Sequence, residues 1–180
     1  MLADERAWEG AVLSTRNARQ LYESAIVVNN LGNVGCASSL MVLSSEESAK
    51  AMSIGLHIST PKSESDIKRI FASHKYKHDN AAHFSSMFHL LIGLTHEPEK
   101  GKPRHGECGI LNTLEEWRIK ADSIKKNGFY VDYVNEEWLS PLYMAPEVFE
   151  KMKFQAETLL SVAEGFFLVG TLNELQKNKG

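Results

Sequence analysis

The sequence predicts an all-α protein, and three observations support this fold class. Apolar residues recur at spacings of three and four over most of the chain, as they do along one face of an amphipathic helix. The breaks between these segments contain glycine, asparagine and proline, and strand-like alternation is scarce. With 180 residues and 43% hydrophobic content, the chain is long enough for one domain, residues 1–180, with its own core.

The first two helices are expected at residues 4–30 and about 34–58. Apolar residues of the first segment recur at helical spacings: Ala7, Ala11, Ala18, Leu21, Ala25 and Val28. The segment NNLGNVG then interrupts the pattern and suits a connection between two helices. In the second segment we expect Leu40, Leu43 and Met52 to be buried, and a proline follows its end.

A third helix is expected after Ser63, which is suited to cap it, with Asp66 three residues later. We predict one continuous helix, because its inward-facing positions alternate at spacings of four and three. These positions are Ile67, Phe71, His74, His78, Ala81, Ser85, Phe88 and Ile92. Two histidines therefore lie on a stripe that is otherwise mostly apolar.

The rest of the chain completes a bundle of about five helices. EPEKGKPRHGECG, residues 97–109, contains two prolines and three glycines and is expected to be a loop. A fourth helix should follow, with Asn112 or Thr113 as its cap and Gly128 as its stop. The aromatic segment FYVDYVNEEWLSPLYMAPEV is expected to be an ordered connector or a short strand pair, and the last helix should begin near Pro146.

Charge and composition limit the classes of function. The formal net charge of −3 excludes an overall basic protein that coats nucleic acid, but it permits a local basic patch. The start MLADERAWEG does not resemble a signal peptide, and no apolar run reaches the roughly 20 residues of a membrane span. Cys36 and Cys108 lack a CxxC spacing. We therefore expect a cytoplasmic protein with reduced thiols and no membrane association.

The inward position of His74 and His78 allows three interpretations. Long helices often bury a hydrogen-bonded histidine, so the first interpretation is that both are core residues. Lys75 and Lys77 favour instead a wet inward face, in a cleft or a subunit interface, because cations are costly to bury. Histidines four residues apart also bind zinc or iron. However, the chain has no Glu-x-x-His pair of the kind that di-iron bundles use, and the lysines oppose a divalent cation. We therefore expect no metal and no other cofactor.

Two further patterns lie near these histidines in the predicted bundle. The Glu46–Glu47 pair with Lys50 is typical of a helix-surface ion pair, but on the second helix it may instead orient a histidine of the third. Arg69 and His74 form an R-x4-H pattern. On a straight helix five residues separate these side chains by about 140°, so they converge only if the helix bends or a second subunit contributes.

Three segments together resemble one family, in the order in which that family has them. SSEESAK resembles the EE-x-x-K element of AbiV-type abortive infection proteins, ASHKYKHD resembles their S-H-K-x-K element, and FYVDYVNEEWLSP resembles their aromatic connector. The AbiV family belongs to the HEPN superfamily of helical bundles, which includes many dimeric, metal-independent ribonucleases. In those enzymes an R-x4-6-H motif is catalytic. In this sequence Ile70 follows the arginine, where HEPN nucleases commonly have a polar residue.

The resemblance implies an all-α, HEPN-like bundle that acts in phage defence by cutting RNA and halting translation. It assigns catalytic roles to His74, Arg69 and Glu47, and it assigns substrate binding to Lys75, Lys77, His78 and Lys50. The partners it implies are RNA, a second copy of the chain that faces the first across the third helix, and a phage-encoded activator. Two alternatives remain. One is a non-enzymatic protein that binds a phage product and blocks translation, and the other is a HEPN partner of a nucleotidyltransferase.

Overall fold

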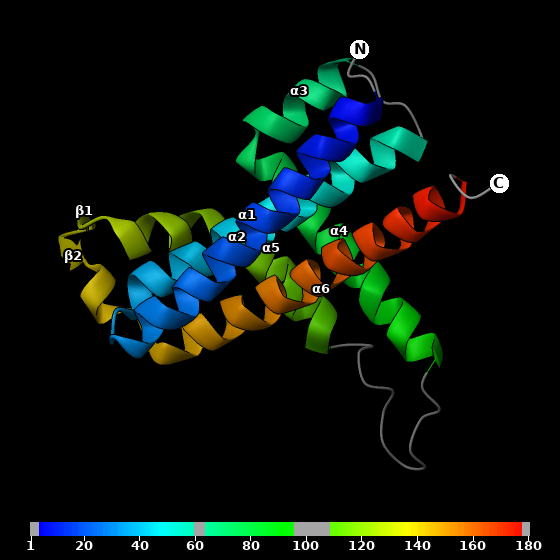
Figure 1. Ribbon diagram of the computed structural model, residues 1–180. Helices are drawn as coiled ribbons and strands as arrows, with labels where there is room; N and C mark the ends of the chain where they lie inside the picture. The colour runs from blue at the N-terminus through cyan, green and yellow to red at the C-terminus, as the bar shows by residue number, and fades with distance from the viewer. Residues whose placement is uncertain (1–3, 60–63, 96–108, 178–180) are drawn as a thin grey trace.

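The structure, a computed structural model, describes residues 4–59, 64–95 and 109–177 (Figure 1). These ranges form a helical bundle with one small hairpin, which confirms the all-α prediction. The helices are α1 (Asp4–Asn30), α2 (Val34–Ser59), α3 (Glu64–Ala72), α4 (His74–Thr95), α5 (Gly109–Phe129) and α6 (Pro146–Lys177). The hairpin strands are β1 (Asp132–Val134) and β2 (Glu137–Leu139), and a 3-10 turn, η1 (Pro141–Tyr143), follows them.

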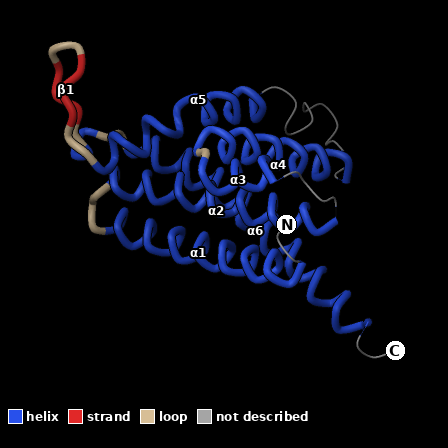
Figure 2. Tube along the Cα trace, turned by 90° about the horizontal axis from the view of Figure 1, so that it is seen from above, coloured by secondary structure: helices blue, strands red, loops and turns tan. Residues whose placement is uncertain are grey.

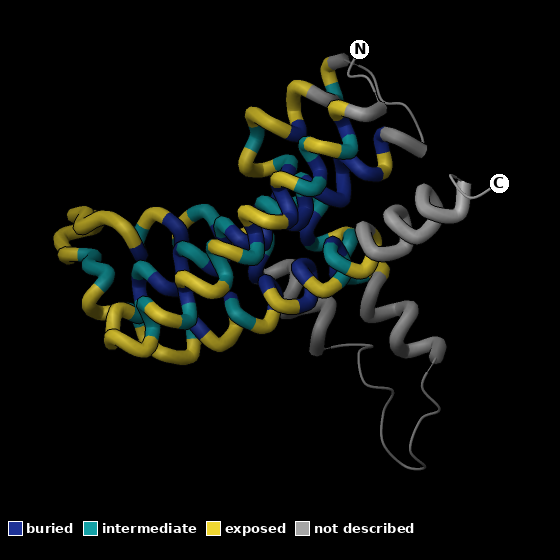
Figure 3. The backbone as a smooth tube through the Cα atoms, viewed as in Figure 1, coloured by how far each residue is buried: buried dark blue, intermediate teal, exposed yellow. Residues whose placement is uncertain are grey.

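The central helix of the bundle is α2, which packs against each of the other five helices. Its partner α1 runs antiparallel to it, and the turn between them uses Gly32 at a φ of 82°, a backbone conformation that favours glycine. Both helices have nearly the predicted bounds. Figure 3 shows buried positions where the helices pack together and exposed positions on the outside of the bundle. Because α2 contacts all the other helices, side chains from several of them can meet at its surface.

Small side chains allow α1 and α2 to pack closely along their length. The predicted apolar positions of α1 face the interior, with Ala7, Ala11, Ala18 and Ala25 fully buried and the two larger residues half-buried. On α2 the prediction was correct for Met52, which is buried in the main core. It was wrong for Leu40 and Leu43, which are only half-buried, because Met41 and Val42 beside them fill the core.

The prediction of one continuous third helix was wrong, because the structure has two helices there, α3 and α4. The chain leaves the helical conformation at Ser73, whose hydroxyl accepts a hydrogen bond from the Tyr76 amide at 3.2 Å. A serine in this position caps a new helix instead of continuing the old one. As a result the predicted inward stripe is not continuous. Phe71 is half exposed, whereas Ile70 is fully buried in a second apolar cluster with α1 and α2.

Beyond the break the predicted stripe is correct for His78, Ala81 and Ser85, which are buried. It is wrong for His74, which is exposed at the first residue of α4. The side chains of Ile67, Phe88 and Ile92 lie outside the described residues, as do Ser63, the predicted loop at 97–108 and Cys108. Cys36 is a free thiol.

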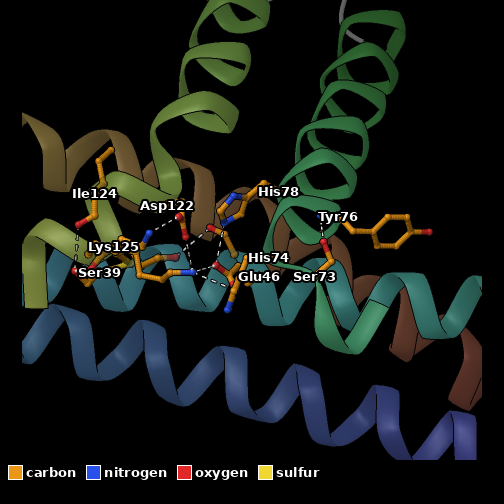
Figure 4. Close-up of polar contacts among 12 residues, drawn as sticks. Ser39, Glu46, Ser73, His74, Tyr76, His78, Asp122, Ile124 and Lys125 are labelled. Atoms are coloured by element: carbon orange, nitrogen blue, oxygen red, sulfur yellow. Dashed lines mark hydrogen bonds and ion pairs between the residues drawn. The ribbon is translucent and has the colours of Figure 1, made fainter. Parts of the chain in front are cut away.

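The predicted role of Gly128 as a helix stop was wrong. Helix α5 begins at Gly109, ahead of the predicted cap, and continues through Gly128 to Phe129. A Cβ on Gly128 would overlap the hydroxyl of Ser39 and the carbonyl of Gly35 on α2. The Ser39 hydroxyl also donates to the Lys125 carbonyl at 2.9 Å (Figure 4). Glycine is therefore needed for the close approach of α5 to α2, which also fixes the rotation of α5 about its axis.

The aromatic connector folds as the predicted strand pair and projects from one end of the bundle (Figure 2). Its turn places Asn135 and Glu136 at positive φ, as in type I′ hairpins. Tyr133 pairs with Trp138 across the strands, with ring centroids 4.9 Å apart, and both rings are exposed. Helix α6 then begins at Pro146, as predicted. Across the described ranges, none of the helices is both long and apolar enough to cross a membrane.

The close approach at Gly128 leads to a stability prediction. Gly128→Ala should lower the free energy of unfolding by about 1–3 kcal/mol, because the added methyl group separates α5 from α2. Gly165→Ala is the matched control, because this helical glycine in α6 has no atom within 4 Å of the added Cβ. The control should be neutral or stabilise by up to about 1 kcal/mol. Urea denaturation measures both, and equal effects would contradict the proposed contact.

Candidate functional site

A buried carboxylate on α2 joins three helices. Glu46 is only 2% exposed, and its two oxygens accept hydrogen bonds from side chains of α4 and α5 (Figure 4). Oε2 lies 2.6 Å from His74 Nδ1, and Oε1 lies 2.9 Å from His78 Nε2 and 2.7 Å from Lys125 Nζ. Figure 4 shows both imidazoles and the ammonium converging on the carboxylate. The site is thus centred on one anion with three nitrogen donors.

The three donors keep Glu46 ionised. Burial alone would raise the pKa of this carboxyl, but the hydrogen bonds from His78, Lys125 and His74 together outweigh burial. They lower the pKa of Glu46 from 4.5 to about 2. The group is therefore a carboxylate at neutral pH and can only accept hydrogen bonds.

This charge state determines the tautomer of His74. Because the Glu46 carboxylate accepts from His74 Nδ1, that nitrogen must carry the hydrogen, so in the neutral ring Nε2 has the free lone pair. The ammonium of Lys125 lies 3.1 Å from the same Nδ1, but both nitrogens then carry hydrogens and face the shared carboxylate. The His74 side chain is 54% exposed. A carboxylate-oriented imidazole with an accessible Nε2 is the arrangement of a general base.

His78 and Lys125 are positioned differently from His74, because both are largely enclosed. The His78 side chain is 4% exposed, and its ring meets the Trp117 ring edge-on at 5.4 Å. Lys125 lies 3.3 Å from Asp122, one turn earlier on α5. These two residues hold Glu46 in place and compensate its charge, while His74 is the histidine that faces solvent.

A pocket of about 440 Å³ opens beside His74, between α4 and α5. Its wall is mostly charged: His74, Lys75, His78, Asp79, Arg118, Ile119, Asp122 and Lys126. Three of these residues are lysine or arginine and two are aspartate, so the wall is cationic before the histidines are considered. Arg118 binds Asp79 at 2.9 Å, and Lys126 lies 3.3 Å from Asp122. The pocket therefore joins an accessible imidazole to fixed cations.

Only some of the predicted site residues meet here. His74, His78 and Lys75 line the pocket. The neighbouring residue Glu46, and not Glu47, contacts the histidines, and Glu47 instead pairs with Lys50 at 2.6 Å.

Lys77 is buried and does not line the pocket either. Burial lowers the pKa of its ammonium, while the nearby Glu46 carboxylate opposes this shift. The roles predicted for Lys77, Glu47 and Lys50 therefore remain predictions without a position in this pocket.

The Arg69 side chain, on α3, packs against Tyr76 of α4. Its guanidinium stands over the Tyr76 ring, 5.3 Å from the centroid, and Figure 4 shows Tyr76 pointing away from Glu46. The helix does break between Arg69 and His74, but no contact described in this structure brings the two side chains together. The R-x4-H pattern is therefore not assembled within one copy of the chain.

Sequence reasoning missed the part of the site that α5 supplies. Lys125 contacts a carboxylate 79 residues away, and no motif marks it. A spacing of four places three charged residues of α5 on one side of the helix: Arg118, Asp122 and Lys126. Such a pattern is typical of an ordinary solvent-exposed face. In the described ranges, no cluster of three or more His, Cys, Asp or Glu side chains is arranged to hold a metal ion.

In a comparison with protein-family models, the model described as AbiV, of the HEPN group, matches residues 6–160. No curated protein and no solved structure matches the chain.

The charge state of Glu46 predicts how stability depends on pH. Its pKa in the folded protein, about 2, lies below the ordinary value of 4.5, so its contribution is complete above about pH 4.5 and is lost as the pH falls toward 2. The shift corresponds to about 3 kcal/mol. Glu46→Gln should flatten this part of the stability profile, measured by urea denaturation at several pH values.

The matched control for this prediction is Glu47→Gln, one residue along α2. Glu47 forms an ion pair with Lys50 at 2.6 Å, whereas both histidines contact Glu46. Glu47→Gln should therefore keep the steep loss of stability below pH 4.5. An unchanged acid profile in Glu46→Gln would contradict the assignment of this transition to Glu46.

Proposed function

The chain belongs to the AbiV family of HEPN proteins, an abortive infection family, and from this premise we propose that it acts by cutting RNA without a metal ion. The observation that carries the proposal is the Glu46–His74 pair beside a cationic pocket. An RNA substrate brings its own nucleophile, the 2′-hydroxyl, so the protein needs to move protons and stabilise charge. The residues around the pocket are suited to both tasks.

The proposed reaction begins at His74 Nε2. This nitrogen takes the proton of the 2′-hydroxyl, and the 2′-oxygen attacks the adjacent phosphorus. The bond from phosphorus to the 5′-oxygen breaks, and an acid returns a proton to that oxygen. The products are a 2′,3′-cyclic phosphate and a 5′-hydroxyl. Glu46 remains ionised and stabilises the imidazolium that forms on His74, as carboxylates do beside catalytic histidines.

The need for an acid in this reaction is an argument for a second copy of the chain in the active site. Of the two histidines in the described pocket, His74 is exposed and His78 is enclosed by Glu46 and Trp117. A single copy thus presents one accessible imidazole, whereas the reaction uses a base and an acid. We propose a two-fold homodimer in which each copy contributes a His74 near the start of α4 to one shared cleft.

A specific observation favours a second candidate function, a protein that acts by binding. The hairpin end of the bundle exposes large apolar and aromatic side chains: Tyr130, Val131, Tyr133, Trp138, Leu142 and Tyr143. Exposed patches of this kind are common at interaction sites. Under this alternative the protein binds a phage product or blocks translation directly, and the hairpin is the surface that matters.

The nuclease proposal predicts a loss of activity in His74→Ala. Cleavage of total RNA, measured with and without phage lysate, should fall by about 10²- to 10⁴-fold, because a general acid or base typically contributes that much. His83→Ala is the matched control, since His83 is an exposed histidine of the same helix that does not line the pocket. The control should cut at the rate of the wild-type protein.

The chemistry of the cut provides a separate check. A 2′-deoxy nucleotide at the cut site should block cleavage, EDTA should not, and the fragments should end in cyclic or 3′-phosphate. Activity that EDTA removes and magnesium restores would point to a metal nuclease. Protection against phage without cleavage under any triggered condition would favour the binding protein.

The homodimer predicts a mass of about twice the chain in multi-angle light scattering at micromolar concentration. It also predicts that mixed dimers of wild-type and His74→Ala chains have far less than half of the wild-type activity, because the two histidines serve one cleft. Full activity in a monomer would contradict the shared site.

A further inference from the structure

The pocket beside His74 has cations that the R-x4-H pattern does not include. Arg118, Asp122 and Lys126 follow one another at intervals of four on α5, so they form a single charged row along one wall. The facing wall, on α4, carries Lys75 and Asp79 at the same interval. Arg118 and Lys126 are eight residues apart, or about 12 Å along the helix. A row of this length can contact a nucleic-acid strand over about 12 Å as the strand passes His74.

Carboxylates hold these cations in position without neutralising the wall. Asp79 binds the Arg118 guanidinium at 2.9 Å, and Asp122 lies 3.3 Å from both Lys125 and Lys126. Burial would raise the pKa of Asp122, but hydrogen bonds from Lys126 and Lys125 lower it. Lys126 is 68% exposed and Arg118 is 32% exposed, so a ligand in the pocket can reach both.

The wall also offers a contact for the nonpolar part of a nucleotide. Ile119 lines the pocket and is 66% exposed, although it stands among charged residues. A base or ribose can pack on an exposed aliphatic side chain while its phosphate meets the neighbouring cations. The pocket volume of about 440 Å³ is within the range of small-ligand sites.

Arg69, the cation of the sequence pattern, is not available to this pocket within the same copy. It stands over Tyr76, and Tyr76 points away from Glu46 (Figure 4). The charge that stabilises a phosphate beside His74 must then come from another helix or another copy.

We infer that the pocket between α4 and α5 binds the phosphodiester backbone of single-stranded RNA through Arg118 and Lys126, with His74 at the scissile phosphate. This inference rests on the proposed function and assigns its phosphate-binding residues. Arg118 has the planar fork that binds two phosphate oxygens at once, and Lys126 provides an exposed point charge farther along the row.

Binding is measured separately from cleavage with a fluorescent 2′-O-methyl RNA oligonucleotide, which has no free 2′-hydroxyl and so is not cut. Anisotropy titrations at several salt concentrations compare wild type with Arg118→Gln and Lys126→Gln. Each variant should bind about tenfold more weakly, and the slope of log affinity against log salt should shrink by about 0.7 for each lost phosphate contact. Lys120→Gln is the matched control, because Lys120 is an exposed lysine of α5 outside the pocket wall.

The outcomes separate this inference from the nuclease proposal. Weaker binding in Arg118→Gln and Lys126→Gln supports the site even if the wild-type protein cuts no RNA, in which case only the nuclease proposal fails. Wild-type affinity in both variants overturns the site, and His74-dependent cleavage in the same proteins would leave the nuclease proposal standing. A loss confined to Arg69→Gln, or no binding by the wild-type protein, also overturns it. Circular dichroism melts check folding, and Lys126→Gln changes a side chain exposed enough to leave the core intact.

Discussion

The buried Glu46 carboxylate determines how α4 and α5 pack against α2. Removing a carboxylate from water costs several kcal/mol unless charged or polar partners replace the lost hydration. Here the partners come from α4 and α5, so both helices must pack against α2 at defined positions along its axis, next to Glu46. The cap at Ser73 starts α4 one residue before His74, and the close approach at Gly128 sets the rotation of α5 that directs Lys125 inward.

The same hydrogen bonds connect stability to the proposed chemistry. His78 and Lys125 compensate the buried charge, and this leaves Glu46 ionised and able to orient His74. A mutation of an enclosed member of this cluster should therefore affect folding and activity together, whereas the exposed ring of His74 can be changed with less effect on the fold. The cationic row on α5 lies outside the cluster, so its charges can be varied separately.

Much of the bundle was predictable from the sequence, but the site was predictable only in part. The bounds of α1 and α2 were predictable because NNLGNVG interrupts the helical pattern between them and a proline follows the second helix. The break at Ser73 was not predictable from the spacing of apolar residues. It depends on one local hydrogen bond, and the buried positions after it continue at helical spacing.

The side chains of Glu46 and Glu47 point about 100° apart around the helix axis. A motif of two adjacent acids does not indicate which of them faces the histidines. Lys125 and Arg118 belong to the site through the packing of distant helices, and no local pattern reports such contacts. The hydrogen bond to Glu46 fixes the neutral His74 ring with its hydrogen on Nδ1 and its lone pair on Nε2. Long-range ¹H–¹⁵N correlation NMR of the neutral His74 ring measures this tautomer directly. We expect the Nδ1–H form in the wild-type protein and a mixture or the opposite tautomer in Glu46→Gln. A wild-type ring with its hydrogen on Nε2 would contradict the orientation of His74 by Glu46.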